Sequence, residues 1–281
     1  MTSSSPATFG PLIERRNAAG PLRLRDEIRD LVRQQSLLYE LVHRDLTVRY
    51  KRSALGFLWT MLHPLLLMLI FTAVFSNLFR FQTPHYETYF LSAYIAWNFF
   101  SQTVVNAMAS VSWNGHLMKR VRVPLSIFTI STAISGIVNL LLSLIVLFGI
   151  MLVLRVPLRP AVLYLPVSLT ILFVFTLGVS LALTAISVYF GDVREMVQAG
   201  MPALMYLTPV IYPITIVPER YQWVVRSNPL MYIVELVRLP LYYKLVPSVR
   251  IAGGGALVAV IALVGGWMIF RHLAPRFHAH L

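Results

Sequence analysis

Residues 125–154 have the sequence LSIFTISTAISGIVNLLLSLIVLFGIMLVL, which contains no charged residue. A helix needs about 20 apolar residues to cross the ~30 Å hydrocarbon core of a bilayer. Further apolar runs lie at 55–79, 89–111, 161–189, 197–212 and 251–270. The sequence therefore predicts an all-α polytopic membrane protein with six transmembrane helices.

The composition supports this class. The 281-residue chain is 57% hydrophobic and only 12% charged, unlike ordinary soluble domains. Its net charge of +13 comes from cations between the apolar runs, so attraction to anionic lipid headgroups explains the charge better than nucleic-acid binding. The absence of cysteine excludes disulfides and zinc–thiolate sites. No apolar core of a cleavable signal peptide precedes the first run.

The cations also predict the orientation. If both termini are cytoplasmic, sixteen of the 24 Lys and Arg residues lie on the inner side and eight on the outer side. Inner loops of membrane proteins carry the excess of Lys and Arg. We therefore expect cytoplasmic N- and C-termini.

The chain divides into four segments. Residues 1–21 lack periodicity and predict a flexible cytoplasmic tail, whereas 22–52 predict a basic amphipathic helical segment on the membrane surface. Residues 53–272 form the six-helix transmembrane domain, and 273–281 a cytoplasmic C-terminal tail. The connection 213–250 is too long for a turn and carries apolar residues at near-helical spacing, which predicts re-entrant helices in the last outer loop.

Signatures of catalysis are missing. No glycine-rich loop ends in Lys-Ser or Lys-Thr, so we expect any ATP hydrolysis to take place in a partner subunit. No HExxH motif or other metal-ligand spacing occurs, and no pair of carboxylates is spaced for acid–base chemistry. The sequence predicts neither catalytic nor metal-ligating residues.

Two inner connections allow two interpretations each. The basic stretch 114–124 is either a positive-inside anchor or a short helix presented to a cytosolic partner. Asp192 and Glu195 are spaced as a capping box that would start the fifth helix, and a contact with a partner is the alternative.

Aromatic residues crowd the outer end of the second apolar run. They are Tyr86, Tyr89, Phe90, Tyr94, Trp97, Phe99 and Phe100. An interfacial aromatic belt explains such a cluster. The alternative is the lining of a conduit, since aromatic faces can stack against the C–H faces of sugar rings without selecting particular hydroxyls.

Residues 44–59, RDLTVRYKRSALGFLW, followed by His63-Pro64, closely resemble the segment at which permeases of bacterial ABC exporters of polysaccharide and polyol phosphate enter the membrane. The outer loop resembles theirs in TPVIYP at 208–213, Val217-Pro218, NPL at 228–230, and Glu235 with Arg238. The resemblance covers about 22–270. One departure is Gly191, which stands where the family has an arginine before the aspartate.

The resemblance implies a homodimer bound to two copies of an ATP-binding cassette subunit, in the bacterial cytoplasmic (inner) membrane. ATP and Mg would be held by that partner, and no cofactor by this chain. The substrate would be a lipid-linked glycan of the O-antigen, capsule or teichoic acid type. An exporter of a small lipid or drug, and an integral membrane glycan or acyl transferase, are the alternatives. The transferase would need acid–base or metal-binding residues clustered at one membrane face.

The resemblance also suggests roles for individual residues. Coupling to the ATPase is expected at Asn114, His116, Lys119, Arg120, Arg122, Asp192 and Glu195. The lipid phosphate is expected at a gate formed by Arg29, Arg33, Arg44 and Arg49. The glycan path is expected along Trp59, Tyr94, Trp97, Phe99, Phe100 and Tyr212.

Overall fold

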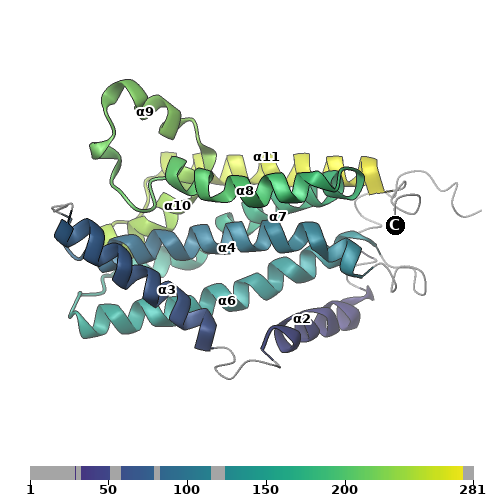
Figure 1. Cartoon of the computed structure of the whole chain (residues 1–281), viewed down its shortest axis with the longest axis horizontal. Helices are drawn as coiled ribbons and strands as arrows, with labels where there is room; N and C mark the ends of the chain where they lie inside the picture. The colour runs from purple at the N-terminus through teal and green to yellow at the C-terminus, as the bar shows by residue number, and fades with distance from the viewer. Residues whose placement is uncertain (1–28, 30–32, 51–57, 79–82, 115–123, 275–281) are drawn as a thin grey trace, which may run out of the picture.

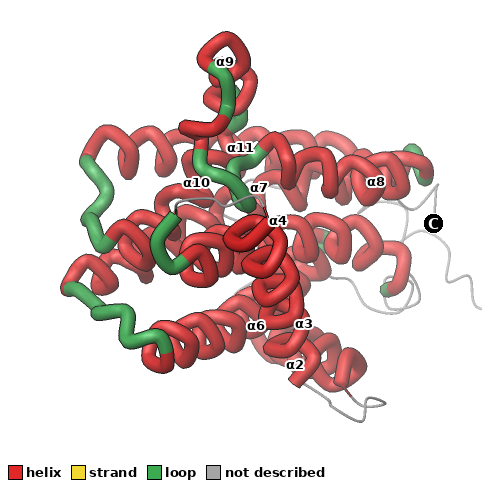
Figure 2. The backbone as a smooth tube through the Cα atoms, turned by 60° about the vertical axis from the view of Figure 1, so that its left-hand side comes forward, coloured by secondary structure: helices red, strands yellow, loops and turns green. Residues whose placement is uncertain are grey.

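The structure, a computed structural model, describes residues 29, 33–50, 58–78, 83–114 and 124–274. Within these ranges the chain forms helices and no strand, which confirms the all-α class (Figures 1 and 2). The helices are α2 (Gln35–Tyr50), α3 (Leu58–Phe71), α4 (Tyr86–Trp113), α6 (Ser126–Val153), α7 (Leu165–Tyr189), α8 (Asp192–Leu207), α9 (Glu219–Arg226), α10 (Pro229–Arg238) and α11 (Val249–Leu273). A π-helical stretch (Thr72–Leu78) extends α3, a 3-10 turn (Pro160–Tyr164) precedes α7, and a second π-helical stretch (Leu239–Tyr243) extends α10.

Four helical stretches in the described part of the chain are long and apolar enough to cross a membrane. They are Leu58–Phe75, Ser126–Val153, Pro160–Tyr189 and Val249–Leu273. These agree with four of the six predicted runs within a few residues. The count of six is not confirmed, because α4 is 28 residues long but carries many polar side chains and α8 has only 16 residues.

The polar helix α4 lies at the centre of the molecule. In Figure 1 it runs through the middle of the bundle, and it packs against α3, α6, α7, α8 and α10. Most of its residues from Tyr86 to Val111 are buried. Neighbouring helices therefore shield much of α4 from its surroundings. A helix that is shielded in this way can cross a membrane and still carry polar side chains.

Helices α7 and α11 pack closely together. A Cβ atom on Gly178 would collide with the backbone of Ala262 and Leu263, and one on Gly266 with the carbonyl of Gly178. Small residues at such positions let two helix backbones approach each other. Near the start of α11 the packing differs, because a Cβ on Gly253 or Gly254 would meet nothing within 4 Å, whereas one on Gly255 would lie 2.5 Å from the Leu236 side chain.

The fifth predicted run, 197–212, begins on α8 and extends past its end. The helix stops at Leu207, and residues 208–213 continue as irregular backbone. The following connection contains two short helices, of which α9 stands apart from the bundle and α10 is largely buried (Figure 1). Asn228 caps α10 by accepting a hydrogen bond from the Leu230 N–H, with Pro229 in the first helical position.

The amphipathic segment is described only in part. In α2, Leu41 is buried in a cluster with Val111, Ile127 and Phe128. Its apolar stripe thus packs on the beginning of α6 and the end of α4. The predicted part of this helix before residue 29 lies outside the described residues.

Candidate functional site: a polar groove

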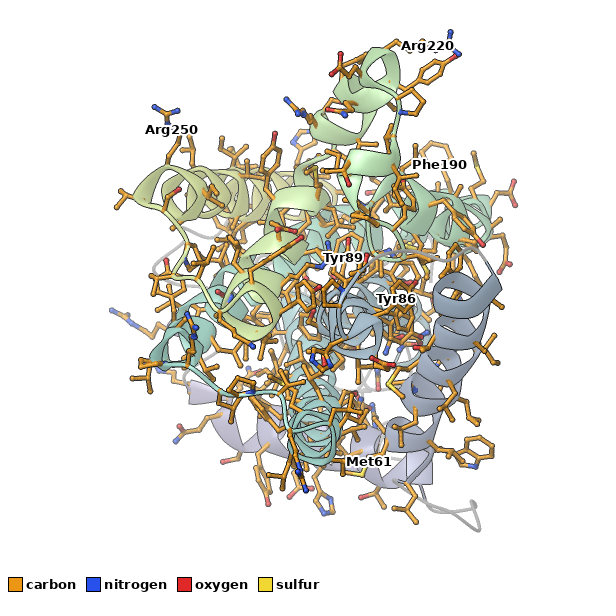
Figure 3. The ribbon with its side chains drawn as sticks, turned by 90° about the vertical axis from the view of Figure 1, so that its left-hand side faces the viewer. Met61, Tyr86, Tyr89, Phe190, Arg220 and Arg250 are labelled. Carbon is orange, nitrogen blue, oxygen red and sulfur yellow. The ribbon has the colours of Figure 1, made fainter. Side chains whose placement is uncertain are left out.

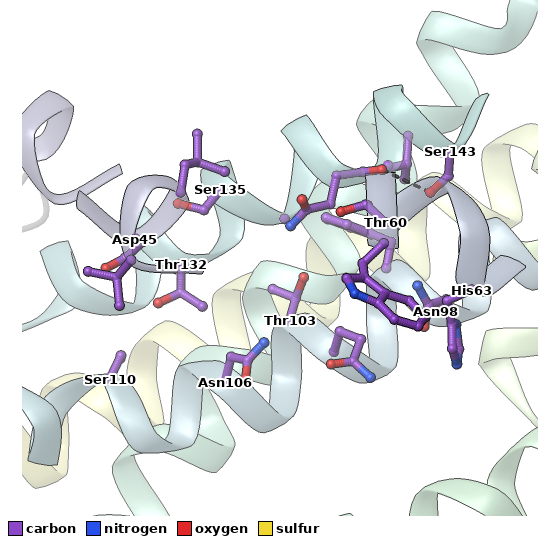
Figure 4. A pocket seen from close by; sticks show the side chains of 18 of the residues that line it. Asp45, Thr60, His63, Asn98, Thr103, Asn106, Ser110, Thr132, Ser135 and Ser143 are labelled. Atoms are coloured by element: carbon purple, nitrogen blue, oxygen red, sulfur yellow. Dashed lines mark hydrogen bonds between the residues drawn. The ribbon is translucent and has the colours of Figure 1, made fainter. Parts of the chain in front are cut away.

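A cavity of about 780 Å³ lies between α2, α3, α4 and α6. Its polar lining comes from all four helices, as Figure 4 shows from close by. We call it the polar groove and define it by Arg44, Asp45, Trp59, Thr60, His63, Asn98, Phe99, Gln102, Thr103, Asn106, Ser110, Asn114, Thr132, Ser135, Asn139 and Ser143. An enclosed polar surface of this kind is costly in hydrocarbon unless water or a polar ligand covers it.

Helix α4 contributes a polar stripe. Asn98, Gln102, Asn106, Ser110 and Asn114 follow one another at intervals of four residues, and all line the groove. Residues four apart lie one above the other on a helix, so the stripe runs along the groove. Each amide offers two N–H donors and a carbonyl acceptor.

Helix α6 faces this stripe with hydroxyl groups. Thr132, Ser135 and Ser143 each donate a hydrogen bond to a carbonyl of their own helix, at 2.9, 2.9 and 3.0 Å. These bonds satisfy the hydroxyl hydrogens and leave oxygen lone pairs as acceptors towards the groove. The groove thus offers amide donors from one wall and hydroxyl acceptors from the other, a mixture that suits a ligand rich in hydroxyl groups.

At the base of the groove, helices α4 and α6 approach each other closely. A Cβ on Gly136 would lie 2.5 Å from Thr103 Oγ1 and 3.0 Å from the Phe99 ring. Thr103 is 2% exposed, and its hydroxyl has no hydrogen-bond partner in the described protein.

One end of the groove is closed by a small network. Arg44 on α2 donates hydrogen bonds to Asn114 Oδ1 at 2.8 Å and to Asp45 Oδ1 at 3.0 Å. Asn114 in turn donates to the Ser110 carbonyl at 2.7 Å. A predicted gate residue, Arg44, therefore contacts a predicted coupling residue, Asn114, directly before the connection 115–123.

The predicted coupling residues Asp192 and Glu195, at the connection between α7 and α8, lie near this end of α4. Arg194 on α8 places its guanidinium 5.7 Å from the centre of the Trp113 ring. Asp192 and Glu195 stand exposed in the first turn of α8. The capping-box interpretation is wrong, because Gly191 is the N-cap residue and no side chain caps the helix. The helix does begin at the predicted place.

The aromatic residues mostly lie away from the groove. Trp59 and Phe99 line it, whereas Tyr94, Trp97 and Phe100 belong to the core and are 3%, 7% and 4% exposed. These core rings contact other rings of α4 and α7, and Tyr94 also contacts the His63 ring of α3. Tyr212 lies in the irregular segment after α8, where its hydroxyl donates to the Tyr206 carbonyl. Core packing accounts for the buried rings, and their part in a glycan path stays a prediction.

Other predicted residues are only partly placed. His116, Lys119, Arg120 and Arg122 lie outside the described residues, as does the side chain of Arg49. Arg29 and Arg33 are described and exposed. Among the described residues, no three His, Cys, Asp or Glu side chains come together as a metal site.

At the opposite end of the bundle, Arg238 binds the irregular segment that follows α8. Its guanidinium is 2% exposed, donates to the carbonyls of Pro209 and Val210 at 2.7 and 3.1 Å, and bonds Glu235 at 3.3 Å. It also lies 4.1 Å from the centre of the Tyr89 ring. The outer-loop motifs that are separated in sequence thus meet in space.

Two tyrosines complete this outer knot, which we define as Tyr86, Tyr89, Arg238 and the carbonyls of 209–211. Tyr86 donates to the Ile211 carbonyl at 2.7 Å. Figure 3 shows Tyr86 and Tyr89 inside the bundle, whereas Arg220 and Arg250 point outward. Nearby, Tyr242 donates to the Pro84 carbonyl at 2.8 Å, and partial burial raises the pKa of this phenol, which keeps it a donor.

Comparison with known proteins identifies the family. Residues 36–242 match the model of the family described as ABC-2 type transporter. The chain belongs to the ABC-2 type transporter family. The match takes in α2 to α10, and therefore both the polar groove and the outer knot.

Relatives with known names share most of this length. The chain is 29% identical over 257 residues to the O-antigen export system permease protein RfbA of Myxococcus xanthus, covering 89% of this chain and 97% of the relative. It is 27% identical over 249 residues to the protein of the same name from Klebsiella pneumoniae, covering 86% and 93%. The polysialic acid transport protein KpsM of Escherichia coli is 22% identical over 217 residues, covering 73% and 81%.

Sequence reasoning missed the polar groove. The four-residue spacing of amides in 98–114 was visible and would have indicated a polar helix face within an apolar run. The pairing of that face with α6 and α2 depends on tertiary packing and had no signal in the sequence.

Proposed function

We propose that this chain is the permease subunit of an ATP-driven exporter of a lipid-linked polysaccharide, and that the polar groove is part of the glycan path. The observation that carries the proposal is the paired polar lining of α4 and α6 in a chain similar to O-antigen and polysialic acid transport proteins. A glycan cannot dissolve in hydrocarbon and needs polar partners during its passage.

The proposal includes the assembly. The chain acts as a homodimer with two ATP-binding cassette subunits in the bacterial inner membrane, and both termini face the cytoplasm. Six helices cross the bilayer, namely α3, α4, α6, α7, α8 and α11, while α9 and α10 shape the outer exit. At 1.5 Å per residue, the 16 residues of α8 span about 24 Å, so the irregular segment after it completes the crossing.

In this arrangement the ATPase acts on the groove through its closed end. The cations of 115–123 and the start of α8 bind the ATP-binding subunit. Movement there reaches Asn114 and, through its hydrogen bond, Arg44 on α2. Opening of this contact exposes the groove to the lipid-linked phosphate, for which Arg44 is a bidentate ligand once it leaves Asp45 and Asn114.

The test is ATPase activity of this chain co-purified with an ATP-binding cassette subunit in lipid nanodiscs, with and without lipid-linked glycan. Hydrolysis that requires both chains and is stimulated by the glycan supports the proposal. Stimulation by small lipids or drugs but not by the glycan would favour the alternative exporter. Modification of the glycan by this chain alone would replace transport with a transferase function.

A further inference from the structure

A second cavity of about 900 Å³ lies between α3 and α6, and it is almost entirely apolar. We call it the apolar cleft and define it by Leu58, Met61, Leu62, Leu65, Met68, Leu69, Thr72, Ala73, Glu87, Val146, Gly149, Ile150, Val153 and Leu154. Its polar members are Thr72 and Glu87 only.

Helix α3 separates the cleft from the polar groove. The groove is lined by Trp59, Thr60 and His63, and the cleft by Leu58, Met61, Leu62 and Leu65 of the same turns. At 100° per residue these two sets lie on opposite sides of the helix. One helix therefore presents a polar face to one cavity and an apolar face to the other.

Helix α6 joins the two cavities along its length. Thr132, Ser135, Asn139 and Ser143 line the groove, and the same helical face continues through Val146, Ile150 and Val153 into the cleft. The face thus changes from polar to apolar between Ser143 and Val146, in the second half of a single helix. Such a change suits a ligand with a polar head and a long apolar chain lying along α6.

We propose that the apolar cleft binds the lipid chain of the carrier to which the glycan is attached, while the polar groove holds the first sugars. This inference rests on the proposed function. The stretch from Val146 to Leu154 rises about 12 Å, so a carrier chain must extend at least this far beyond the groove to fill the cleft. We therefore expect binding to depend on the length of the chain.

The cleft can be blocked without disturbing the core. A Cβ on Gly149 would meet nothing within 4 Å, so Gly149→Trp fills the cleft without a clash at its attachment point. Ile145→Trp is the matched control, since Ile145 is 59% exposed on the same helix and lines neither cavity. We expect Gly149→Trp to weaken chain binding about tenfold, the effect of displacing about two buried CH₂ groups.

The experiment uses the complete exporter in nanodiscs of phosphatidylethanolamine and phosphatidylglycerol. A long-chain polyprenyl phosphate with a diazirine on its chain is cross-linked by light, and the adducts are located by mass spectrometry. We expect adducts on α3 and α6 at the cleft, competed by unlabelled long-chain polyprenyl phosphate but only weakly by geranyl phosphate. Gly149→Trp should give much weaker labelling at the cleft, and Ile145→Trp should label normally.

Equal labelling by a diazirine phosphatidylglycerol, without competition by polyprenyl phosphate, would overturn the inference and leave the cleft to ordinary bilayer lipid. Unchanged labelling of Gly149→Trp would do the same. The proposed function is tested separately, because Asn106→Leu should slow export of the glycan and still allow labelling of the cleft.

Discussion

At the scale of single residues, α4 shows how a helix can be polar and still belong to a membrane bundle. Its amides at 98, 102 and 106 face the groove, and most of the remaining residues are buried against other helices. The apolar run 89–111 predicts this helix, and its aromatic residues are the most conspicuous feature of the sequence there. Most of the aromatic residues belong to the core, whereas the amide side chains line the cavity.

Asn106→Leu tests the role of these amides. The change keeps the volume and removes donors and an acceptor, and losing one or two hydrogen bonds to sugar hydroxyls costs about 1.5 kcal/mol, so export should slow about tenfold. Accumulation of glycan at the cell surface measures this rate. Gln198→Leu, an exposed amide on α8 outside the groove, should export normally. Equal loss in both variants would argue against a specific role for the groove.

Arg238→Met tests the outer knot. Removing the guanidinium leaves the carbonyls of Pro209 and Val210 without their donor and Glu235 without its partner, at a cost of about 3 kcal/mol or more. We expect a clearly lower thermal unfolding temperature in detergent. Arg226→Met should have little effect, because Arg226 is exposed and, among the described residues, bonds only Gln222. Similar melting of both variants would show that the knot adds little to stability.

At the scale of elements, hydrophobicity predicted helix existence and bounds well. The run 125–154 corresponds to Ser126–Val153, and 251–270 lies within Val249–Leu273. What hydrophobicity could not predict is which face of each helix meets which neighbour. The burial of Arg238 illustrates this. A cation in a predicted outer loop is expected at the surface, and only the tertiary structure shows the backbone carbonyls that surround it.

The α7–α11 contact offers a test with adjacent glycines. Gly266→Val places a branched side chain against the Gly178 backbone, and overpacking of this kind costs about 1–3 kcal/mol. Gly265→Val has the same helix propensity, and its Cβ would meet nothing within 4 Å. The thermal unfolding temperature in detergent should therefore be lowered only by Gly266→Val. Comparable destabilisation by Gly265→Val would point to helix propensity instead of packing.

At the scale of the whole molecule, the end of α4 and the beginning of α8 lie together at one end of the bundle, and the outer knot lies at the other. Reversing the charge of Lys119, Arg120 and Arg122 together should abolish export while the protein remains inserted, because the ATP-binding subunit loses its contact. Export is measured beside co-purification of that subunit and a topology reporter. Reversal at Arg155, Arg159 and Arg250, which are exposed near the other end, is the matched control. Export that survives the first reversal would remove the coupling assignment.

The central claim is that the glycan passes through the polar groove, and cross-linking during transport tests it most directly. A photoreactive amino acid replaces Asn106 in the groove or Ile145 on the exposed side of α6, and the exporter is illuminated while it moves glycan. Our account predicts glycan adducts at position 106 that require ATP, and none at position 145. Adducts that are absent at 106 while export continues would contradict it and place the glycan path elsewhere.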